Sequence, residues 1–355
     1  MATPNIRIYD SEGYVAEALE KYISDLSAKF IADYGSFSVV LSGGSLIDTM
    51  MEPPYVNCID WSKWLIFFLD ERVVPLDNPD SNYKLAYDGF LSKTPSSNFH
   101  LLKMATPNIR IYDSEGYVAG ALAKYISDLS AKFIADYGSF SVVLSGGSLI
   151  DTMRKLVEPP YVNGIDWSKW LIFFLDERVV PLDNPDSNYK LAYDGFLSKV
   201  PIPKSNIYPI KEGLTPEEAA DEYEQRIKDL VANKTLRTSH KTGFAKFDLM
   251  LVGMGPEGHV ASLFCWHFQR FEKKKWVTFI TDSPKPPPNR ITFTFPLINS
   301  ASEIAMVVTG EDAADAIKVA LGKHANDYYP LPVQKVAPEN GLTWFLDREA
   351  TSELN

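Results

Sequence analysis

The sequence predicts an α/β fold, with a mainly parallel sheet flanked by helices, in one complete domain that follows a partial duplicate of itself. Two observations support this prediction. In residues 104–355, short apolar runs rich in β-formers alternate with stretches of helical periodicity, which is typical of parallel strands joined by helices. Residues 1–50 recur almost unchanged at 104–153, which indicates an internal duplication.

The two copies of the repeat differ in few places. Glu17 and Glu20 become Gly120 and Ala123, and the offset between the copies then rises from 103 to 106 residues because copy two has three extra residues before Glu158. Solenoid repeats are shorter and more numerous. Two long and nearly identical copies therefore indicate a recent partial duplication or a joined gene model.

Only copy two continues into the rest of a domain. Copy one matches it as far as residues 61–93, which reappear at 167–199, and the similarity then fades. We therefore predict an incomplete duplicate at 1–103 and a complete domain at 104–355. An incomplete sheet has an open edge and uncovered apolar faces, so copy one would have to find a partner, exchange with the other copy or remain poorly packed; self-association through it is one of the expected outcomes.

The first elements of the complete domain alternate between strand and helix. Residues 108–112 predict a strand, and residues 116–137 carry apolar side chains at helical spacing before a closing glycine. Residues 140–144 form a short apolar run, which predicts a buried strand that enters a Ser-Gly-Gly-Ser turn and a helix. Residues 170–175 predict the next strand, and it ends at Asp-Glu-Arg.

The second half of the domain continues this alternation. Residues 215–233 begin with Thr-Pro-Glu-Glu, a capped and acidic first turn that predicts a helix. Residues 247–252 predict a strand that leads into a glycine-rich turn. Further strands are predicted at 276–280, 290–295 and 304–308. Ligands of open α/β sheets bind at the C-terminal ends of strands, so the polar segments that follow these strands form the candidate site.

Composition argues against several classes of partner. The 355-residue chain has a net charge of −11 and a pI near 5.0. Nucleic acids and anionic membranes both require a basic surface, so we expect neither as a partner, whereas a small anionic metabolite needs only a few converging cations. No apolar run approaches the roughly 20 residues of a membrane span. The N-terminus lacks the composition of a signal or transit peptide, so we expect a cytoplasmic protein.

The cysteines and most histidines carry little information about function. Cys58 and Cys265 are the only cysteines, and neither stands in a metal-ligand spacing. We therefore expect neither a disulfide framework nor a zinc site. Four of the five histidines have no distinctive sequence setting and are expected at the surface: His100, His240, His267 and His324.

Two segments could bind an anion. Between strand and helix, Ser145-Gly146-Gly147-Ser148 would place backbone N–H groups and hydroxyls around a phosphate, although a plain glycine turn explains the segment equally well. At the next strand end, Asp176 and Arg178 offer a permanent cation held by carboxylates, and a surface ion pair is the alternative.

Two further residues complete the candidate set. Arg290 begins a strand after the proline-rich segment Ser-Pro-Lys-Pro-Pro-Pro-Asn, where a solvated linker is the alternative reading. His259 follows a strand and the turn Gly-Met-Gly-Pro-Glu-Gly, where its near-neutral pKa would suit a general base. A single histidine more often has a structural role, so His259 gains weight only from its combination with the other segments.

In this order, the four segments resemble the 6-phosphogluconolactonase family, with a plant-like proline-rich segment. The resemblance extends over 104–355, and copy one matches only the first two segments. It implies a Rossmann-like sheet and hydrolysis of 6-phosphoglucono-δ-lactone, a phosphosugar lactone, to 6-phosphogluconate in the oxidative pentose phosphate pathway, without metal or cofactor. It also implies that His259 is the general base, that Asp176 orients the site, and that the Ser-Gly-Gly-Ser segment, Arg178 and Arg290 hold the phosphate.

The chain departs from the family pattern at two places. After Phe264, residues 265–275 replace the usual Pro-Gly-His-Pro, and Ala313 stands where a lysine near the phosphate is common. Copy one has no counterpart of His259, so we expect its segment Ser42 to Ser45 and its Arg72 to contribute nothing to turnover.

Two other functions remain open on the sequence. A glucosamine-6-phosphate isomerase or deaminase of related fold would carry Asn-Glu-Pro where this chain has Ser262-Leu263-Phe264. A catalytically impaired duplicate would act only as a phosphosugar-binding or self-associating protein.

Overall fold

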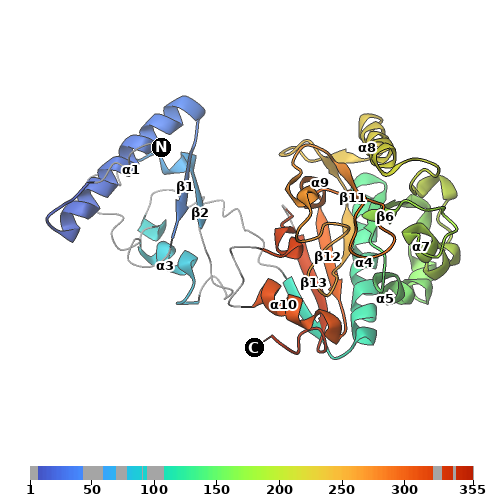
Figure 1. Cartoon of the computed structure of the whole chain (residues 1–355). Coiled ribbons are helices and arrows are strands. Elements are labelled where there is room, and N and C mark those ends of the chain that lie inside the picture. The colour runs from blue at the N-terminus through green and yellow to red at the C-terminus, as the bar shows by residue number, and fades with distance from the viewer. Residues whose placement is uncertain are drawn as a thin grey trace. The chain divides into compact units, whose positions relative to one another are not determined.

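The computed structural model describes residues 7–42, 59–68, 78–89, 91–93, 108–322, 330–338 and 341–354. The chain divides into two compact units, here called unit 1 (residues 1–106) and unit 2 (residues 107–355). The blue elements in Figure 1 belong to unit 1, and those from green to red belong to unit 2. No helix among the described residues is both long enough and apolar enough to cross a bilayer.

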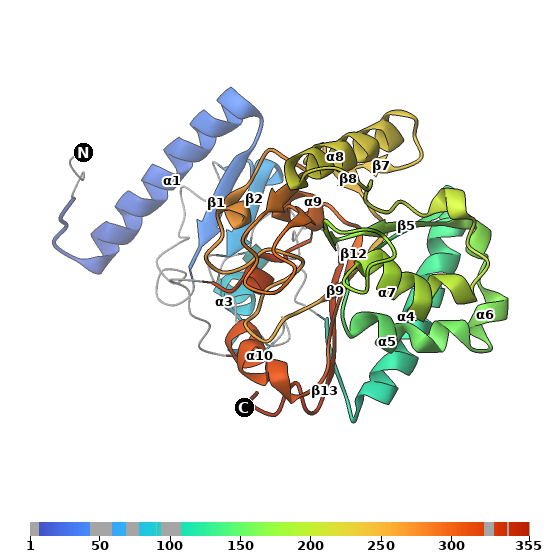
Figure 2. The same ribbon diagram turned by 45° about the vertical axis from the view of Figure 1, so that its right-hand side comes forward.

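The centre of unit 2 is a six-stranded sheet in which every neighbouring pair of strands is parallel (Figures 1 and 2). Its strands are, in spatial order, β3 (Asn108–Tyr112), β13 (Gly341–Asp347), β12 (Glu303–Val308), β9 (Leu249–Gly253), β4 (Phe140–Leu144) and β5 (Trp170–Phe174). The predicted parallel α/β architecture is thus confirmed. β13 lies outside the strands predicted from the sequence.

Helices lie on both sides of this sheet, and each side has its own apolar cluster. The first cluster includes α4 (Glu115–Tyr137), α5 (Leu149–Thr152) and α7 (Asn188–Gly195); the second includes α8 (Pro216–Ala232), α9 (Phe295–Asn299) and α10 (Ala314–Leu321). Strand side chains alternate between the two clusters: Ile172 belongs to the first and Phe173 to the second. Both faces of the sheet are therefore buried, as expected for parallel strands.

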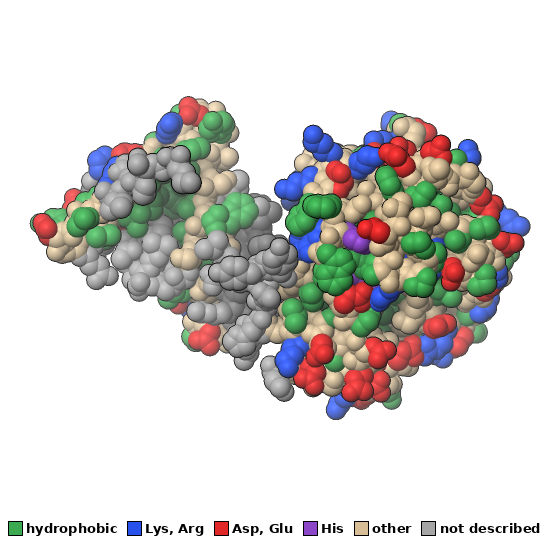
Figure 3. All heavy atoms as spheres, viewed as in Figure 1, with side chains coloured by type: hydrophobic (Ala, Val, Ile, Leu, Met, Phe, Trp, Pro, Cys, Tyr) green, Lys and Arg blue, Asp and Glu red, His purple; other side chains and the backbone are tan. Residues whose placement is uncertain are grey.

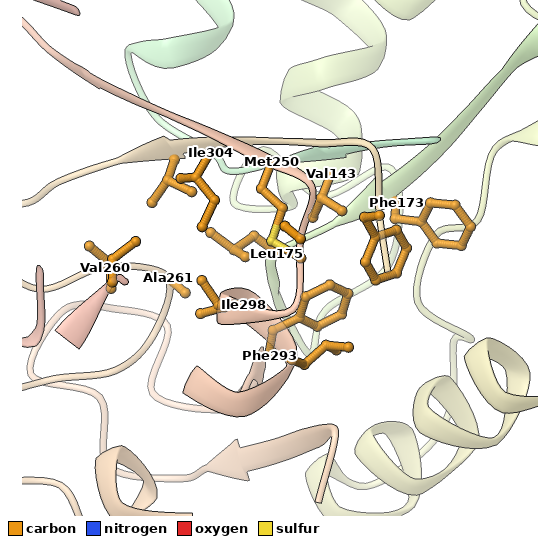
Figure 4. Packing of buried hydrophobic residues seen from close by; sticks show 14 of the residues in the cluster. Val143, Phe173, Leu175, Met250, Val260, Ala261, Phe293, Ile298 and Ile304 are labelled. Carbon is orange, nitrogen blue, oxygen red and sulfur yellow. The ribbon is translucent and has the colours of Figure 1, made fainter. Parts of the chain in front are cut away.

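The second cluster fixes the segment that follows β9. Figure 4 shows Val143, Met250 and Ile304 from the central strands close to Ile298 of α9 and to Val260. Val260 is fully buried, so the chain is anchored in the core immediately after the glycine-rich turn. A turn anchored in this way can hold a side chain in a constant position.

A smaller antiparallel sheet has the strand order β10 (Val277–Ile280), β11 (Arg290–Phe293), β6 (Asp176–Arg178). The predicted strand at 290–295 is too long, because α9 begins at Phe295. Pro296 lies in the first turn of α9, and proline has no N–H to donate to a strand ladder. Apart from 3-10 helices, the remaining described elements of unit 2 are α6 (Tyr161–Gly164), β7 (Arg237–Thr238) and β8 (Ala245–Lys246).

Unit 1 reproduces the local structure of copy two. It contains α1 (Glu12–Tyr34), β1 (Phe37–Leu41), β2 (Trp64–Phe68) and α3 (Asn82–Gly89). Strands β1 and β2 pair in parallel in the same register as β4 and β5. The indole N–H of Trp64 donates to Ser27 Oγ at 2.7 Å, as that of Trp170 donates to Ser130 Oγ at 2.8 Å.

The two copies differ in what covers them. Val143 of β4 is fully buried, whereas its counterpart Val40 in β1 is 56% exposed. In unit 2, β9 pairs with β4 and Val143 belongs to the apolar cluster that includes α8 and α9, while among the described residues of unit 1 the only strand beside β1 is β2. Identical sequences thus take the same local structure, and their burial depends on the strands that only copy two continues into.

Candidate active site

All the predicted site residues of unit 2 line one cavity of about 480 Å3. It opens at the C-terminal ends of the central strands and is bounded by the Ser145–Ser148 segment, Asp176, Arg178, His259 and Arg290. Acidic and basic side chains are interspersed over the face of unit 2 seen in Figure 3. With a net charge of −11, the protein can bind an anion only where cations converge, as they do in this cavity.

The Ser-Gly-Gly-Ser segment is held tightly at the end of β4. Ser145 Oγ accepts a hydrogen bond from Gly253 N at 2.9 Å, which ties the segment to β9. A Cβ on Gly146 would lie 2.0 Å from Asn188 Oδ1, and Gly147 has a φ of +74°, so both positions require glycine. The α-helix predicted after this turn is short: α5 has four residues and continues as a 3-10 helix over Met153–Val157.

Two arginines face each other across the small sheet. Arg290 of β11 is the register partner of Arg178 in β6, and neither forms an ion pair with a carboxylate of the described residues. Arg178 donates to the carbonyl oxygen of Asp186, and Arg290 donates to those of Lys285, Pro286 and Pro287 at 2.6–3.1 Å. Backbone carbonyls therefore hold both guanidinium groups without neutralising them, which leaves their charge for an anionic ligand.

Burial lowers the pKa of Arg290, although nearby Asp176 opposes the shift. Asp176 is itself buried, and its Oδ2 accepts a hydrogen bond from Ser262 Oγ at 2.7 Å. Ser262 also accepts from Arg290 at 3.4 Å. These contacts place a carboxylate at the cavity wall without pairing it directly to either arginine.

Asn188 is a cavity residue that the sequence analysis did not identify. Its amide donates to the backbone oxygen of Asp176 at 2.9 Å, and its Oδ1 is buried without a hydrogen-bond partner. It begins α7 and is fixed there by Glu177, which accepts from the backbone N–H groups of Asn188 and Tyr189 at 2.6 and 2.7 Å. Burial raises the pKa of Glu177 to about 7.

His259 is held by a carboxylate on one side of its ring. Its Nδ1 lies 2.9 Å from Glu257 Oε1, so Nδ1 carries the proton and Nε2 is left as the acceptor. The ring lies against that of Phe264, with 4.6 Å between the centroids and an interplanar angle of 33°. Burial lowers the pKa of His259 below its ordinary value of 6.5; Glu257 opposes this shift and Lys285 reinforces it.

Glu257 and Lys285 are further residues that the sequence analysis did not place in the site. Lys285 Nζ lies 3.0 Å from Glu257 Oε2, and Lys285 lines the cavity. Burial alone would raise the pKa of Glu257. Hydrogen bonds from its own backbone N–H and from Lys285, together with electrostatic attraction to His259 and Lys285, outweigh burial and lower this pKa. The spacing Glu-Gly-His was the available signal for Glu257; nothing local in the sequence pointed to Lys285.

The two departures from the family pattern have different structural outcomes. Ala313 lines the cavity, so a lysine at this position would reach the site. Residues 265–275 do not line it. This segment is instead braced by buried Arg270, which donates to the carbonyl oxygens of Cys265 and Pro330.

The expected surface position of the other histidines is wrong for His267. It is buried, with Nε2 3.7 Å from Asp282, whereas His240 is exposed. His100, His324, Cys58 and Arg72 lie outside the described residues. Among the residues that the structure describes, no group of three or more His, Cys, Asp or Glu side chains is arranged to hold a metal ion.

Known proteins resemble the chain at the levels of family, sequence and fold. The model of the glucosamine-6-phosphate isomerases/6-phosphogluconolactonase family matches residues 10–116 and again residues 112–345. The chain is 56% identical over 247 residues to probable 6-phosphogluconolactonase 4, chloroplastic, of Oryza sativa subsp. indica, a match that covers 69% of this chain and 76% of the rice protein. It is 51% identical to probable 6-phosphogluconolactonase 2 of Arabidopsis thaliana, covering 71% and 97%.

A solved structure shares the fold. The 6-phosphogluconolactonase of Thermotoga maritima is 28% identical, with a TM-score of 0.57, and the match covers 68% of this chain and 99% of that protein. The match thus covers almost the whole of that solved relative. The chain belongs to the glucosamine-6-phosphate isomerase/6-phosphogluconolactonase family.

Proposed function

We propose that unit 2 hydrolyses 6-phospho-D-glucono-1,5-lactone to 6-phospho-D-gluconate, the lactone-opening step of the oxidative pentose phosphate pathway. One observation carries the proposal: His259, with Nδ1 engaged by Glu257 at 2.9 Å, lines the same cavity as two arginines that no described carboxylate neutralises. A base and an anion site in one cavity suit a substrate with a phosphate and a reactive carbonyl. The names of the rice, Arabidopsis and Thermotoga relatives support the same reaction.

The phosphate would bind to the Ser-Gly-Gly-Ser segment, Arg178 and Arg290. The guanidinium groups are oriented before the ligand arrives, because backbone carbonyls already hold them. Preorganised donors lose little freedom on binding, and guanidinium groups match phosphate oxygens well. A phosphate bound there would direct the lactone ring toward His259. Asp176, held by the hydroxyl of Ser262, would orient the site.

In the chemical step, Nε2 of His259 takes a proton from a water molecule whose oxygen attacks the lactone carbonyl carbon. The tetrahedral intermediate collapses by breaking the bond between this carbon and the ring oxygen, which receives the proton from His259. Such proton transfer accelerates reactions by about 10²- to 10⁴-fold. Because a lactone is an activated ester, positioning and one base suffice, and the proposed step uses no metal or cofactor.

We propose no catalytic role for unit 1. Copy one has no counterpart of His259. Val40 of its strand β1 is 56% exposed, and we propose that this exposed face allows self-association. The alternative is a catalytically impaired phosphosugar-binding protein. It is supported by Ala313, which lines the cavity where a lysine would add a cation. We propose a cytoplasmic location for the chain; some relatives have chloroplastic in their names and others do not.

An assay of His259→Ala tests this proposal. Freshly generated 6-phosphoglucono-δ-lactone is supplied to the purified full chain, 6-phosphogluconate is detected with its dehydrogenase, and spontaneous hydrolysis is subtracted. We expect the variant to lose about 10²- to 10⁴-fold of the enzymatic rate, and the exposed His240→Ala to retain full activity. Folded wild-type protein without activity would favour the impaired duplicate, and release of ammonia from glucosamine 6-phosphate would favour the deaminase.

A further inference from the structure

Lys285, Glu257 and His259 form a chain of charged contacts at the edge of the cavity. Lys285 Nζ is 3.0 Å from Glu257 Oε2, and Glu257 Oε1 is 2.9 Å from His259 Nδ1. Side-chain exposure falls along this chain, from 41% for Lys285 to 30% for Glu257 and 14% for His259. The two oxygens of one carboxylate are thus divided between a cation near solvent and a buried imidazole.

The backbone of Lys285 is fixed independently of its side chain. Ser283 Oγ accepts a hydrogen bond from Lys285 N at 3.2 Å and donates to Lys285 O at 2.8 Å. The same carbonyl oxygen also accepts from Arg290 at 2.6 Å. Lys285 therefore contacts both halves of the site, with its carbonyl on a phosphate-site arginine and its ammonium group on the carboxylate behind the histidine.

A carboxylate beside a histidine has two opposing effects on a base. It orients the ring and fixes the tautomer, but an uncompensated negative charge also favours the protonated imidazolium, which cannot accept a proton. The charged groups that most affect His259 are Glu257 from its own turn, Lys285 from the proline-rich segment and Asp176 from β6. Arg178 and Arg290 line the same cavity, and Lys285 is the cation that pairs with Glu257.

We propose that Lys285 is a positioning residue of the lactonase reaction proposed above: its ammonium group holds and neutralises Glu257, so that Glu257 orients His259 without causing its protonation. The inference rests on the proposed function for its catalytic meaning, but not for its physical test. The exposed ion pair itself contributes little to stability, so removing Lys285 should change the histidine far more than the fold.

NMR titration of the full chain tests this proposal directly. The Cε1–H signal of His259, identified by its loss in His259→Gln, is followed against pH in wild type, Lys285→Met and Lys285→Arg. We expect the His259 pKa to rise by about one unit in Lys285→Met and to stay at the wild-type value in Lys285→Arg. Lys275→Met is the matched control. Lys275 has a similar exposure and forms an ion pair of 3.1 Å with Asp221, and neither residue lines the cavity.

Kinetics provide the second measurement. In Lys285→Met the acid limb of the pH–rate profile should move upward with the NMR pKa, while the rate on the alkaline plateau changes little. An unchanged or lower pKa in a folded Lys285→Met protein overturns the inference. If wild type proves inactive, the proposed function fails while the titration still decides the role of Lys285.

Discussion

The surroundings of His259 set the pH range in which it can act as a base. Burial beside Phe264 lowers its pKa below the ordinary 6.5, with Lys285 acting in the same direction and Glu257 against it. The neutral imidazole is the form that accepts a proton. A lowered pKa therefore keeps His259 competent at pH values where an exposed histidine is already largely protonated.

This environment predicts the pH dependence of the wild-type enzyme. Activity should be lost as pH falls through the lowered pKa of His259, so the acid limb of kcat/KM should have its midpoint below 6.5. Initial rates measured from about pH 5 to about pH 8, each corrected for spontaneous hydrolysis, give this midpoint. A midpoint at or above 6.5 would contradict the conclusion that burial lowers the pKa of His259.

Single residues of the site were predictable to different degrees. His259 comes after β9 and its glycine-rich turn, and Arg178 comes shortly after β5, within β6; the end of an apolar run is a position that the sequence reveals. Lys285 lies 28 positions from Glu257, and their contact depends on how β11 and β9 are brought together. Asn188 was not predicted, because nothing in its sequence shows that α7 begins there against the cavity.

At the scale of elements, Glu177 joins β6 to α7. Its two carboxylate oxygens accept hydrogen bonds from three backbone N–H groups, those of Arg178, Asn188 and Tyr189, at 2.6–2.8 Å, and one from the Ser187 hydroxyl at 3.2 Å. A buried acceptor of this kind satisfies the first turn of a helix whose N–H groups have no internal partners. It thereby also places Asn188 beside the glycine turn.

We predict that Glu177→Gln destabilises unit 2. The amide nitrogen of glutamine would face N–H donors where the carboxylate now accepts from them, and an unsatisfied buried group costs about 1–3 kcal/mol. Urea denaturation followed by tryptophan fluorescence measures the loss in free energy of unfolding. The matched control is Glu349→Gln, at an exposed position, which should leave stability unchanged.

Strands were easier to predict than the way they associate. Apolar runs such as 140–144 and 170–175 carried enough signal, because parallel strands are buried on both faces. The small sheet could not be foreseen, since β6 is only three residues long and pairs with a strand more than a hundred positions away. The ends of β11 and α5 depended on local turns that periodicity does not resolve.

At the scale of the whole molecule, the two copies form a comparison built into one chain. Ala123 of α4 is 1% exposed, and copy one has Glu20 at the same place. Gly120, whose counterpart is Glu17, is partly exposed, and a Cβ there would meet no atom within 4 Å. Glutamate at position 123 is therefore incompatible with the packing of unit 2, whereas glutamate at position 120 is compatible with it.

We predict that Ala123→Glu lowers the free energy of unfolding of unit 2 by roughly 3 kcal/mol or more, because it overpacks the core and buries a charge. Gly120→Glu should be neutral or stabilising by up to about 1 kcal/mol, since glycine weakens helix interiors. Thermal unfolding of both variants measures the difference. Equal effects at the two positions would show that the packing of α4 does not discriminate between the copies.

Glu20 influences how the newly synthesised chain folds. Strands β9, β12 and β13 leave the ribosome only after both copies have been made, and two nearly identical partners then compete for them. Copy two is nearer along the chain, so it closes the shorter loop. Copy one would have to insert Glu20 where Ala123 is buried. The shorter loop and one side-chain charge together direct the late strands to copy two, so exchange of partners between the copies should be a rare folding error.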